Sequence, residues 1–237
     1  EKCGIPHEFG STGFGVAQAS KVAADVAGID IKKAKVSIHG FGNVGTFTYK
    51  YLTEMGAKVV AIADKSGVIF SEDGFDKKII ENIIHNKGSV QDYGALAERL
   101  NPDDFWGIPV DILIPASVTD VINEGNKNKI RAKIIIEAAN IPMQENVERE
   151  LFKKGILIAP DFLANAGGVI SSYAEYRGYH LKRMFELVER KIIKNVKKVL
   201  SESIKKGIFP REVALNLAQS RVVAKMKKGK TGFKARF

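Results

Sequence analysis

Three glycines at the end of a predicted strand constrain the fold of this chain more than any other feature. Gly40, Gly42 and Gly45 have the spacing G-x-G-x-x-G. The residues before them, 35–39, alternate polar and apolar side chains, which is the period of a half-buried strand. The residues after them carry apolar side chains at intervals of three and four, which predicts a helix over 44–55. A strand that enters a helix through such a turn indicates a β-α-β unit.

The second strand of this unit is predicted over residues 58–63, and it ends on Asp64, about 20 residues after the last glycine. Each glycine has a physical role in such a unit. Gly40 permits the tight turn, Gly42 leaves room for a pyrophosphate against the backbone, and Gly45 lets the helix lie close to the sheet. The positive end of the helix dipole then faces the phosphates, and the terminal acid accepts hydrogen bonds from ribose hydroxyls. The unit therefore predicts dinucleotide binding.

The rest of the chain predicts further alternating strands and helices. Short apolar strands are expected over residues 111–115, 134–137 and 155–160. Such runs between helices are typical of a parallel sheet covered on both faces. Helices are predicted over residues 11–28, 76–86, 92–100, 144–154, 168–207 with a possible break at Gly178, and 210–228. The predicted fold class is α/β, a doubly wound Rossmann-type and mostly parallel sheet with C-terminal helices.

Three segments are expected along the chain. Residues 1–33 would form a linker and leading helix, and residues 34–180 the dinucleotide-binding domain. Residues 181–237 would form a C-terminal helical segment, whose end, 230–237, is expected to be a frayed basic tail.

Polar stretches follow three of the predicted strands, at residues 116–119, 138–140 and 161–168. In open α/β sheets the ligand lies beyond the carboxyl ends of the strands, so these stretches and the glycine turn are expected to surround one crevice. An asparagine after a strand is commonly a turn residue. Asn140 and Asn165 both follow strands of one sheet, so turn residue and ligand contact both stay open.

The start of the first predicted helix leaves the role of Thr12 open. Ser11 or Thr12 can cap its N-terminus. The hydroxyl of Thr12 either serves as that cap or points into a nearby site, and the segment alone favours the cap.

The charge of the chain is uneven. Its formal net charge is +10, and residues 182–237 hold 17 Lys and Arg against 4 Asp and Glu. The excess is best explained by a solvated helical face, and next by a surface that docks on an acidic partner. Nucleic-acid binding is the weakest explanation, because no motif with interleaved aromatic residues accompanies the charge.

Composition excludes other classes. The hydrophobic fraction of 45% and charged fraction of 27% are those of a soluble globular protein. No apolar run approaches the ~20 residues that span a bilayer. The single cysteine, Cys3, has no partner for an internal disulfide and lacks metal-site spacing. We therefore expect a cytoplasmic protein without a bound metal.

Separated segments of the chain resemble the Glu/Leu/Phe/Val dehydrogenase family in order and spacing. They are GFGNVG (40–45), PAS (115–117), EAAN (137–140) and LANAGGV (163–169). The last motif, continued to Tyr176, looks most like glutamate dehydrogenase, and the resemblance covers nearly the whole chain. Members of that family convert an amino acid and oxidised nicotinamide cofactor reversibly to a 2-oxo acid, ammonia and reduced cofactor. The resemblance thus implies an NAD(P)-dependent oxidoreductase.

The resemblance also implies a set of cofactor contacts. It places Asp64 at the adenosine ribose, Asn165 near the nicotinamide and the substrate, and Thr12 at the nicotinamide amide. Other residues would lie along the cofactor or hold its pyrophosphate. These are Gly40, Phe41, Gly42, Asn43, Val44, Gly45, Ala116, Ser117 and Asn140. Residues 139–143, Ala-Asn-Ile-Pro-Met, depart from the family's usual glycine-bearing version.

The implied substrate is glutamate or 2-oxoglutarate. Ser172 falls where glutamate-specific members bind the side-chain carboxylate of the substrate, and branched-chain members look apolar at that point. The family's catalytic lysine and aspartate belong to a separate substrate domain, and neither of their motifs is found here. The chain is thus expected to be the cofactor domain, to need the missing substrate domain for turnover, and to be part of a homo-oligomer in the full enzyme.

The sequence leaves two choices open: NAD or NADP as the cofactor, and an enzyme or a non-catalytic sensor as the kind of protein. Asp64 repels a 2′-phosphate and favours NAD, whereas Lys65 and Ser66 directly after it could bind that phosphate and favour NADP. A non-catalytic nucleotide sensor is the main alternative to an enzyme, because it would use the same glycine turn and terminal acid. A sensor has no need of a substrate-contacting hydroxyl at Ser172.

Overall fold

The structure is a computed structural model that describes residues 9–232, with side chains described through residue 227. Predictions for residues 1–8 and for the end of the basic tail, 233–237, lie outside the described residues.

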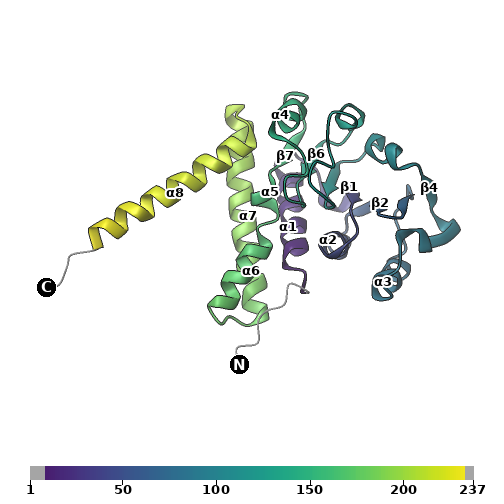
Figure 1. The fold of residues 1–237 in the computed structure, drawn as a ribbon, viewed down its shortest axis with the longest axis horizontal. Helices are drawn as coiled ribbons and strands as arrows, with labels where there is room; N and C mark the ends of the chain where they lie inside the picture. The colour runs from purple at the N-terminus through teal and green to yellow at the C-terminus, as the bar shows by residue number, and fades with distance from the viewer. Residues whose placement is uncertain (1–8, 233–237) are drawn as a thin grey trace.

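A single seven-stranded sheet forms the centre of the molecule (Figure 1). Its spatial order is β4-β3-β2-β1-β5-β6-β7. The five strands from β2 to β7 in this order are parallel, and β3 and β4 add an antiparallel hairpin at one edge. The strands are β1 (Lys35–His39), β2 (Lys58–Asp64), β3 (Gly67–Phe70), β4 (Glu98–Leu100), β5 (Ile112–Pro115), β6 (Ile134–Ile136) and β7 (Leu157–Ala159). The predicted α/β class with a mostly parallel sheet is confirmed.

Helices cover both faces of the sheet. The α-helices are α1 (Ser11–Val26), α2 (Asn43–Glu54), α3 (Lys77–His85), α4 (Glu145–Lys153), α5 (Asp161–Ala164), α6 (Gly167–Tyr176), α7 (Leu181–Lys206) and α8 (Pro210–Gly232). Short 3₁₀ helices lie between them, namely η2 (Ile31–Lys33), η3 (Val90–Leu96), η4 (Pro102–Gly107) and η5 (Lys127–Lys129). Among these residues, no helix combines the length and apolar composition needed to cross a bilayer.

Two hydrophobic cores result from the alternation of side chains along the strands. Ile112 and Ile114 of β5 belong to the core shared with α1, α2, α3 and α7, while Leu113 belongs to the core shared with η4 and α4. Each core lies on one face of the sheet, because successive strand residues point to opposite faces. Strands β2, β5, β6 and β7 are accordingly almost entirely apolar, which is the signature of a doubly wound fold.

The chain reverses its direction of winding at β1. From β1 the chain proceeds to β2 on one side, and it later returns to β5 on the other side. The carboxyl ends of β1 and β5 lie together, since His39 pairs with Pro115. This is the topological switch point, where open α/β sheets leave a crevice for ligands.

One predicted helix and two missed strands, β3 and β4, correct the sequence analysis. Residues 92–100 do not form a helix, because Gly94 adopts φ 76° and ψ −153° and interrupts η3. The following residues extend and pair as β4 with β3, a strand that was not predicted. Glu98 and Arg99 of β4 are exposed and charged, so this strand lacks the apolar run that marks the equally short β6 and β7.

The first helix is a further correction. It begins at Ser11 with Gly10 as its N-cap residue, and neither hydroxyl of Ser11 or Thr12 caps it. Ser11 instead donates to Ser171 Oγ at 3.0 Å, and it is buried. The predicted break at Gly178 is confirmed, since this residue has φ 66° between α6 and α7.

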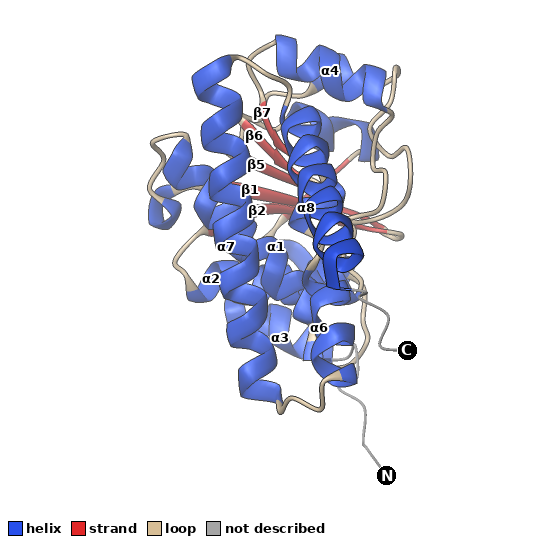
Figure 2. Cartoon of the chain, turned by 90° about the vertical axis from the view of Figure 1, so that its left-hand side faces the viewer, coloured by secondary structure: helices blue, strands red, loops and turns tan. Residues whose placement is uncertain are grey.

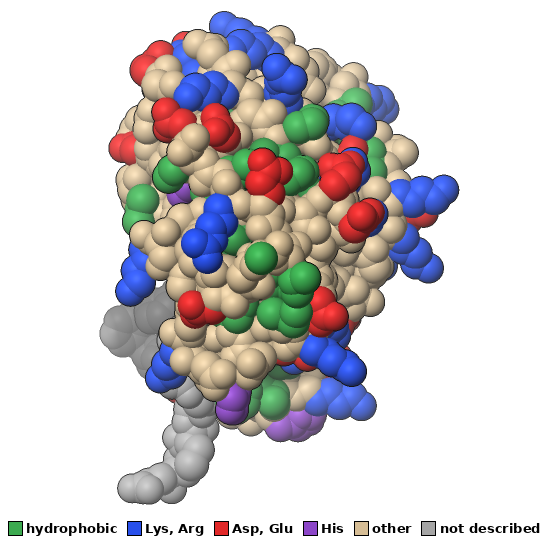
Figure 3. Space-filling view, turned by 90° about the vertical axis from the view of Figure 1, so that its right-hand side faces the viewer, with side chains coloured by type: hydrophobic (Ala, Val, Ile, Leu, Met, Phe, Trp, Pro, Cys, Tyr) green, Lys and Arg blue, Asp and Glu red, His purple; other side chains and the backbone are tan. Residues whose placement is uncertain are grey.

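The last helix, α8, projects away from the rest of the molecule (Figure 1), and in the view turned by 90° it lies in front of the sheet, toward the viewer (Figure 2). Phe209, Val213 and Ala214 at its start are buried, and every described side chain from residue 218 to 227 is exposed. The opposite end of the molecule, with β4 and α3, carries basic and acidic side chains interspersed over its surface (Figure 3). The basic excess of the sequence therefore belongs to α7 and α8 and not to this face.

Candidate functional site

A cavity of about 830 Å³ lies at the switch point of the sheet. Its volume is within the range of small-molecule and cofactor sites. The lining comes from the polar stretches after β5, β6 and β7 and from three helix starts. It consists of Thr12, Val44, Ala116, Ser117, Val118, Thr119, Ala138, Ala139, Asn140, Asn165, Gly168, Val169 and Ser172. The predicted common crevice is thus present.

Three helices begin at this cavity. Thr12, Val44 and Gly168 line it, and each is the second residue of its helix, α1, α2 or α6. As far as the chain is described, none of the three helices has a side-chain cap. The first N–H groups of a helix have no partner within it. The positive dipole ends of the three helices therefore favour an anion, such as a phosphate, in this cavity.

Two of the three motif glycines are required by packing. A Cβ atom at Gly45 would lie 2.0 Å from the carbonyl oxygen of Gly40, and one at Gly40 would lie 2.6 Å from the amide nitrogen of Ser117. Gly40 also has φ 103°, which residues with a side chain rarely adopt. These two glycines let β1, α2 and the start of the 116–119 stretch approach closely.

Gly42 differs from its neighbours. A Cβ atom there would meet nothing within 4 Å, and its φ of −84° is accessible to any residue. Neither packing nor backbone conformation therefore calls for a glycine at this position. The open space beside an uncapped helix start is the room that a pyrophosphate needs against the backbone. The cradle thus fits a dinucleotide.

Asn140 and Asn165 meet at the opposite side of the cavity. Asn165 Nδ2 donates to Asn140 Oδ1 at 2.8 Å. Both side chains line the cavity together with Gly168. A Cβ atom at Gly168 would lie 2.8 Å from Thr12 Oγ1, so this glycine lets α6 pack against the start of α1. The cavity therefore brings both asparagines together with Val44, the one residue of the 40–45 turn that lines it.

Ser117 is held by a residue that sequence reasoning missed. His39 Nδ1 lies 2.9 Å from Ser117 Oγ, and the imidazole ring stacks on Trp106 at 4.6 Å between centroids. Burial lowers the pKa of His39 to about 4, so the ring is neutral at neutral pH. The sequence places His39 only at the end of a predicted strand, and its aromatic partners come from η4, far away in the sequence.

Asp64 and Lys65 do not line the cavity. Asp64 ends β2 beside the glycine turn, since the amide of Gly40 donates to the carbonyl of Ala63 at 2.8 Å. The Asp64 carboxylate accepts N–H bonds from Ser66 at 2.7 Å and from Val90 at 2.9 Å. Lys65 is exposed, and no ion pair joins it to another described residue.

The lining of the cavity is neutral. None of its thirteen residues carries a titratable side chain. Ser172 is exposed and donates to the carbonyl of Gly168 at 3.2 Å, so its hydroxyl is fixed on α6 beside the cavity. Val118, Thr119 and Val169 also line it, although nothing in their residue types had singled them out. In residues 9–232 no group of three or more His, Cys, Asp or Glu is placed to hold a metal ion.

Known proteins are similar to this chain in sequence and in fold. The sequence model of the Glutamate/Leucine/Phenylalanine/Valine dehydrogenase family matches residues 3–229. The NADP-specific glutamate dehydrogenase of Saccharolobus shibatae is 37% identical over 239 residues, which cover 94% of this chain and 56% of that protein. The NAD-specific glutamate dehydrogenase of Clostridioides difficile is 37% identical over 185 residues, which cover 73% of this chain and 44% of that protein.

The fold also matches a solved structure, that of the hetero-hexameric glutamate dehydrogenase from Thermus thermophilus. The TM-score is 0.77 at 23% identity, over 89% of this chain and 51% of that one. The chain spans about half the length of the relatives that it matches. With a family match along nearly its whole length, it belongs to the Glutamate/Leucine/Phenylalanine/Valine dehydrogenase family.

Proposed function

We propose that this chain is the cofactor-binding part of an amino-acid dehydrogenase, and that the amino acid is glutamate. One observation carries the proposal. The cavity at the switch point joins three uncapped helix starts, at Thr12, Val44 and Gly168, with the asparagine pair Asn140 and Asn165. The diphosphate of a nicotinamide dinucleotide can accept hydrogen bonds from the helix starts. The amide on its nicotinamide ring can form hydrogen bonds with the asparagine pair.

The residues that would hold the cofactor follow from this arrangement. The turn from Gly40 to Gly45 would bind the diphosphate through backbone N–H groups, and Asp64 would accept from the adenosine ribose. Asn165 and Thr12 would contact the nicotinamide. Other cavity residues would lie along the cofactor, namely Ala116, Ser117 and Asn140. When bound, the nicotinamide supplies the hydride chemistry, and the protein supplies position and electrostatics.

The substrate part of the proposal rests on α6. The exposed hydroxyl of Ser172 lines the cavity about two turns after Asn165. A hydroxyl there suits the side-chain carboxylate of glutamate or 2-oxoglutarate. The similar proteins named above are glutamate dehydrogenases, which supports the same substrate. A nucleotide sensor would not need this group.

Turnover needs groups that the cavity does not contain. Amino-acid deamination requires an acid or base of suitable pKa within reach of the reacting atoms, and the lining is uncharged. We propose that a substrate domain supplies them and that the assembled enzyme is oligomeric. The similar Thermus thermophilus protein is a hetero-hexamer, which supports an assembly. A cytoplasmic location stays a prediction from the single cysteine.

The choice of NAD or NADP depends on the end of β2. The two similar proteins named above are specific for different cofactors, one for each. The Asp64 carboxylate already accepts two backbone N–H bonds, and these reduce its repulsion of a 2′-phosphate. The exposed ammonium of Lys65 lies next to it in sequence and can bind that phosphate.

The decisive experiment is a titration of the 237-residue chain with NADH and with NADPH, followed by nicotinamide fluorescence. We expect saturable binding, and binding of 2-oxoglutarate to the cofactor-loaded chain that weakens in Ser172→Ala. Glutamate-dependent reduction of the cofactor by this chain should be negligible. No saturation by either nucleotide would contradict the binding proposal, and rapid turnover would contradict the need for a substrate domain.

A further inference from the structure

A buried ionic cluster lies behind the cavity, centred on Arg211 in the first turn of α8. Its guanidinium donates to three carboxylates: Glu148 Oε2 at 2.5 Å, Glu137 Oε2 at 2.7 Å and Asp161 Oδ1 at 3.0 Å. The exposed fractions of the side chains are 0% for both glutamates, 10% for Asp161 and 15% for Arg211. Four elements that are distant in sequence, the end of β6, α4, α5 and α8, are therefore joined by one side chain.

The cluster is short of positive charge. Three carboxylates share one guanidinium, and one oxygen of each glutamate, Glu137 Oε1 and Glu148 Oε1, has no hydrogen-bond partner. Burial, together with the charge of Glu148, raises the pKa of Glu137 well above its usual value. Burial also raises the pKa of Glu148 to about 7. Arg211 is thus the group that makes this concentration of carboxylates tolerable.

One member of the cluster reaches the wall of the cavity. The second oxygen of Asp161, Oδ2, accepts the backbone N–H of Ile141 at 2.9 Å. Each oxygen of this carboxylate therefore has a donor, and the backbone N–H of Asp161 is held as well, because it donates to Glu137 Oε2 at 2.8 Å. Asp161 therefore connects Arg211 to the segment that follows β6.

Ile141 has a strained backbone. Its φ is +48°, in the left-handed region that β-branched residues almost never adopt. Such a conformation is strained and persists only where the surroundings hold it. The carbonyl of Ile141 accepts from the amide of Asp120 at 3.0 Å, and its amide is held by Asp161. A glycine would adopt the same φ without strain.

The strained residue directly follows Asn140. Asn140 Oδ1 accepts from Asn165, and the Asn140 carbonyl accepts from Thr119 Oγ1 at 3.1 Å. If the backbone at Ile141 relaxed to negative φ, the peptide after Asn140 would rotate and the pair with Asn165 would change. The direction of the Asn140 amide in the cavity therefore depends on the hydrogen bond between Ile141 and Asp161.

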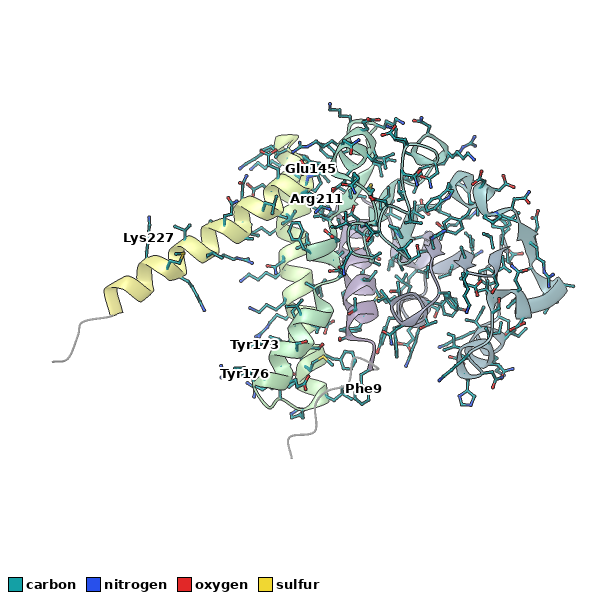
Figure 4. All side chains as sticks on the ribbon, in the orientation of Figure 1. Phe9, Glu145, Tyr173, Tyr176, Arg211 and Lys227 are labelled. Carbon is teal, nitrogen blue, oxygen red and sulfur yellow. The ribbon has the colours of Figure 1, made fainter. Side chains whose placement is uncertain are left out.

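We propose that Arg211 is a positioning residue for the cavity: by fixing Asp161 it holds Ile141 in the left-handed conformation that presents Asn140 to the cofactor. This proposal rests on the proposed function, because it takes the cavity to be the cofactor site. Arg211 itself lies where α8 meets the body of the molecule, whereas Lys227 is far out on the projecting part of the same helix (Figure 4). Only the first turns of α8 are buried, so the influence of this helix on the cavity passes through its start.

The test compares four proteins: the unaltered 237-residue chain, Arg211→Lys, Ile141→Gly and the double variant. Lysine keeps the charge but loses the planar fork that reaches several carboxylates at once. Two quantities are measured, the hydrogen-exchange rate of the residue-141 amide without ligand and the dissociation constant for NADH. Glu148→Gln is the matched control, because it alters the cluster at a carboxylate that has no bond to Ile141.

We expect Arg211→Lys to accelerate exchange of the Ile141 amide about tenfold and to weaken NADH binding by a similar factor, the equivalent of one hydrogen bond of about 1.4 kcal/mol. Glu148→Gln should change neither quantity by more than about twofold. In the Ile141→Gly background, Arg211→Lys should have less than about a threefold effect on binding, because glycine needs no help to keep positive φ.

Two results would overturn the proposal. One is unchanged exchange and unchanged NADH affinity in Arg211→Lys. The other is an equal loss of affinity with and without Ile141→Gly, which would indicate a general structural effect. A failure of the proposed function would be recognised separately, since the unaltered chain would then not bind NADH before any variant is compared.

Discussion

Two polar regions lie side by side at the carboxyl ends of the strands, and they are built on opposite principles. The cavity has a neutral lining and helix starts without side-chain caps. The Arg211 cluster is buried and charged, and most of its polar atoms are paired within the protein. Both regions use the same short segment, because Glu137 belongs to the cluster and Asn140, three residues later, to the cavity.

The difference teaches which polar groups are free to bind a ligand. Two other helix starts have side-chain caps, since Asp76 accepts from the first turn of α3 and His180 from that of α7, whereas α4 and α5 have none among the described residues. At the cavity the corresponding N–H groups of α1, α2 and α6 lack such caps. A dinucleotide would supply the missing acceptors there, whereas the cluster supplies its own partners and fixes the backbone around it.

The largest expected effect comes from breaking the cluster. Arg211→Met leaves three buried carboxylates without their cation, so the free energy of unfolding should fall by about 3–5 kcal/mol. Urea unfolding measures the change. Arg221→Met is the matched control, since Arg221 is on the same helix, is exposed and bonds only Asn195. A loss below 1 kcal/mol in Arg211→Met would show that the cluster contributes little.

The second prediction concerns pH. The pKa of Glu148 is raised to about 7 from 4.5, so the folded chain binds this proton more tightly than the unfolded chain. The contribution of Glu148 to stability is therefore lost as pH rises from about 4.5 to about 7. Desolvation is the main cause, opposed by Arg211 and reinforced by Asp161 and Glu145.

His39 acts in the opposite direction. Its pKa is lowered to about 4 from 6.5, so its contribution to stability rises as pH increases between these values. The effects of Glu148 and His39 on the pH dependence of stability oppose each other, and a variant isolates one of them. Relative to the unaltered chain, Glu148→Gln should gain on the order of 2 kcal/mol of stability between pH 5 and pH 8. Glu189→Gln, which removes an exposed carboxylate of α7 that does not act on Glu148, should show no such gain.

The third prediction separates the glycines of the turn. Gly42→Ala should leave the unfolding free energy within about 0.5 kcal/mol, since its Cβ meets no protein atom. It should weaken NADH binding at least about tenfold, equivalent to ~1.4 kcal/mol. Gly45→Ala should instead destabilise the chain itself, because its Cβ would lie 2.0 Å from the Gly40 carbonyl oxygen. Equal NADH affinities of Gly42→Ala and of the control Gly107→Ala would contradict the diphosphate cradle.

The smallest expected effect is on cofactor choice. Lys65→Ala should weaken NADPH binding by about 1 kcal/mol, as expected for an exposed ion pair, and leave NADH binding unchanged. Lys33→Ala, which removes another exposed lysine, should affect neither. Equal changes for both nucleotides would show that Lys65 does not distinguish them.

The part of the fold that the sequence predicts well is local and periodic. The unit from β1 to β2 combines two long apolar patterns with a spaced glycine turn, and each of its elements was found within a residue or two of its expected bounds. The long helices α7 and α8 were equally clear, because their patterns continue over many turns. The β3–β4 hairpin was missed, because β4 is largely exposed and charged and lacks the apolar run that marks the equally short β6 and β7.

The candidate site, like the fold, was predicted only where the signal in the sequence is local. The motif residues Val44, Asn140, Asn165 and Ser172 were predicted, and they line the cavity. The Arg211 cluster was not, because its four members are separated by up to 74 positions and no spacing connects them. The one local signal was an isoleucine in a segment where the family usually has a glycine. The reason this matters, a positive φ at Ile141, is found only in the structure.

The most direct test of the cavity as the cofactor site is an amide chemical-shift titration of the chain with NADH. We predict that the backbone amides of Asn43 and Val44, on one side, and Asn165 and Gly168, on the other, shift together and saturate with a single dissociation constant. The amide of Asn86, at the end of α3, should not move. Shifts confined to another part of the surface, such as the pocket between Tyr173 and Arg183, would contradict the assignment.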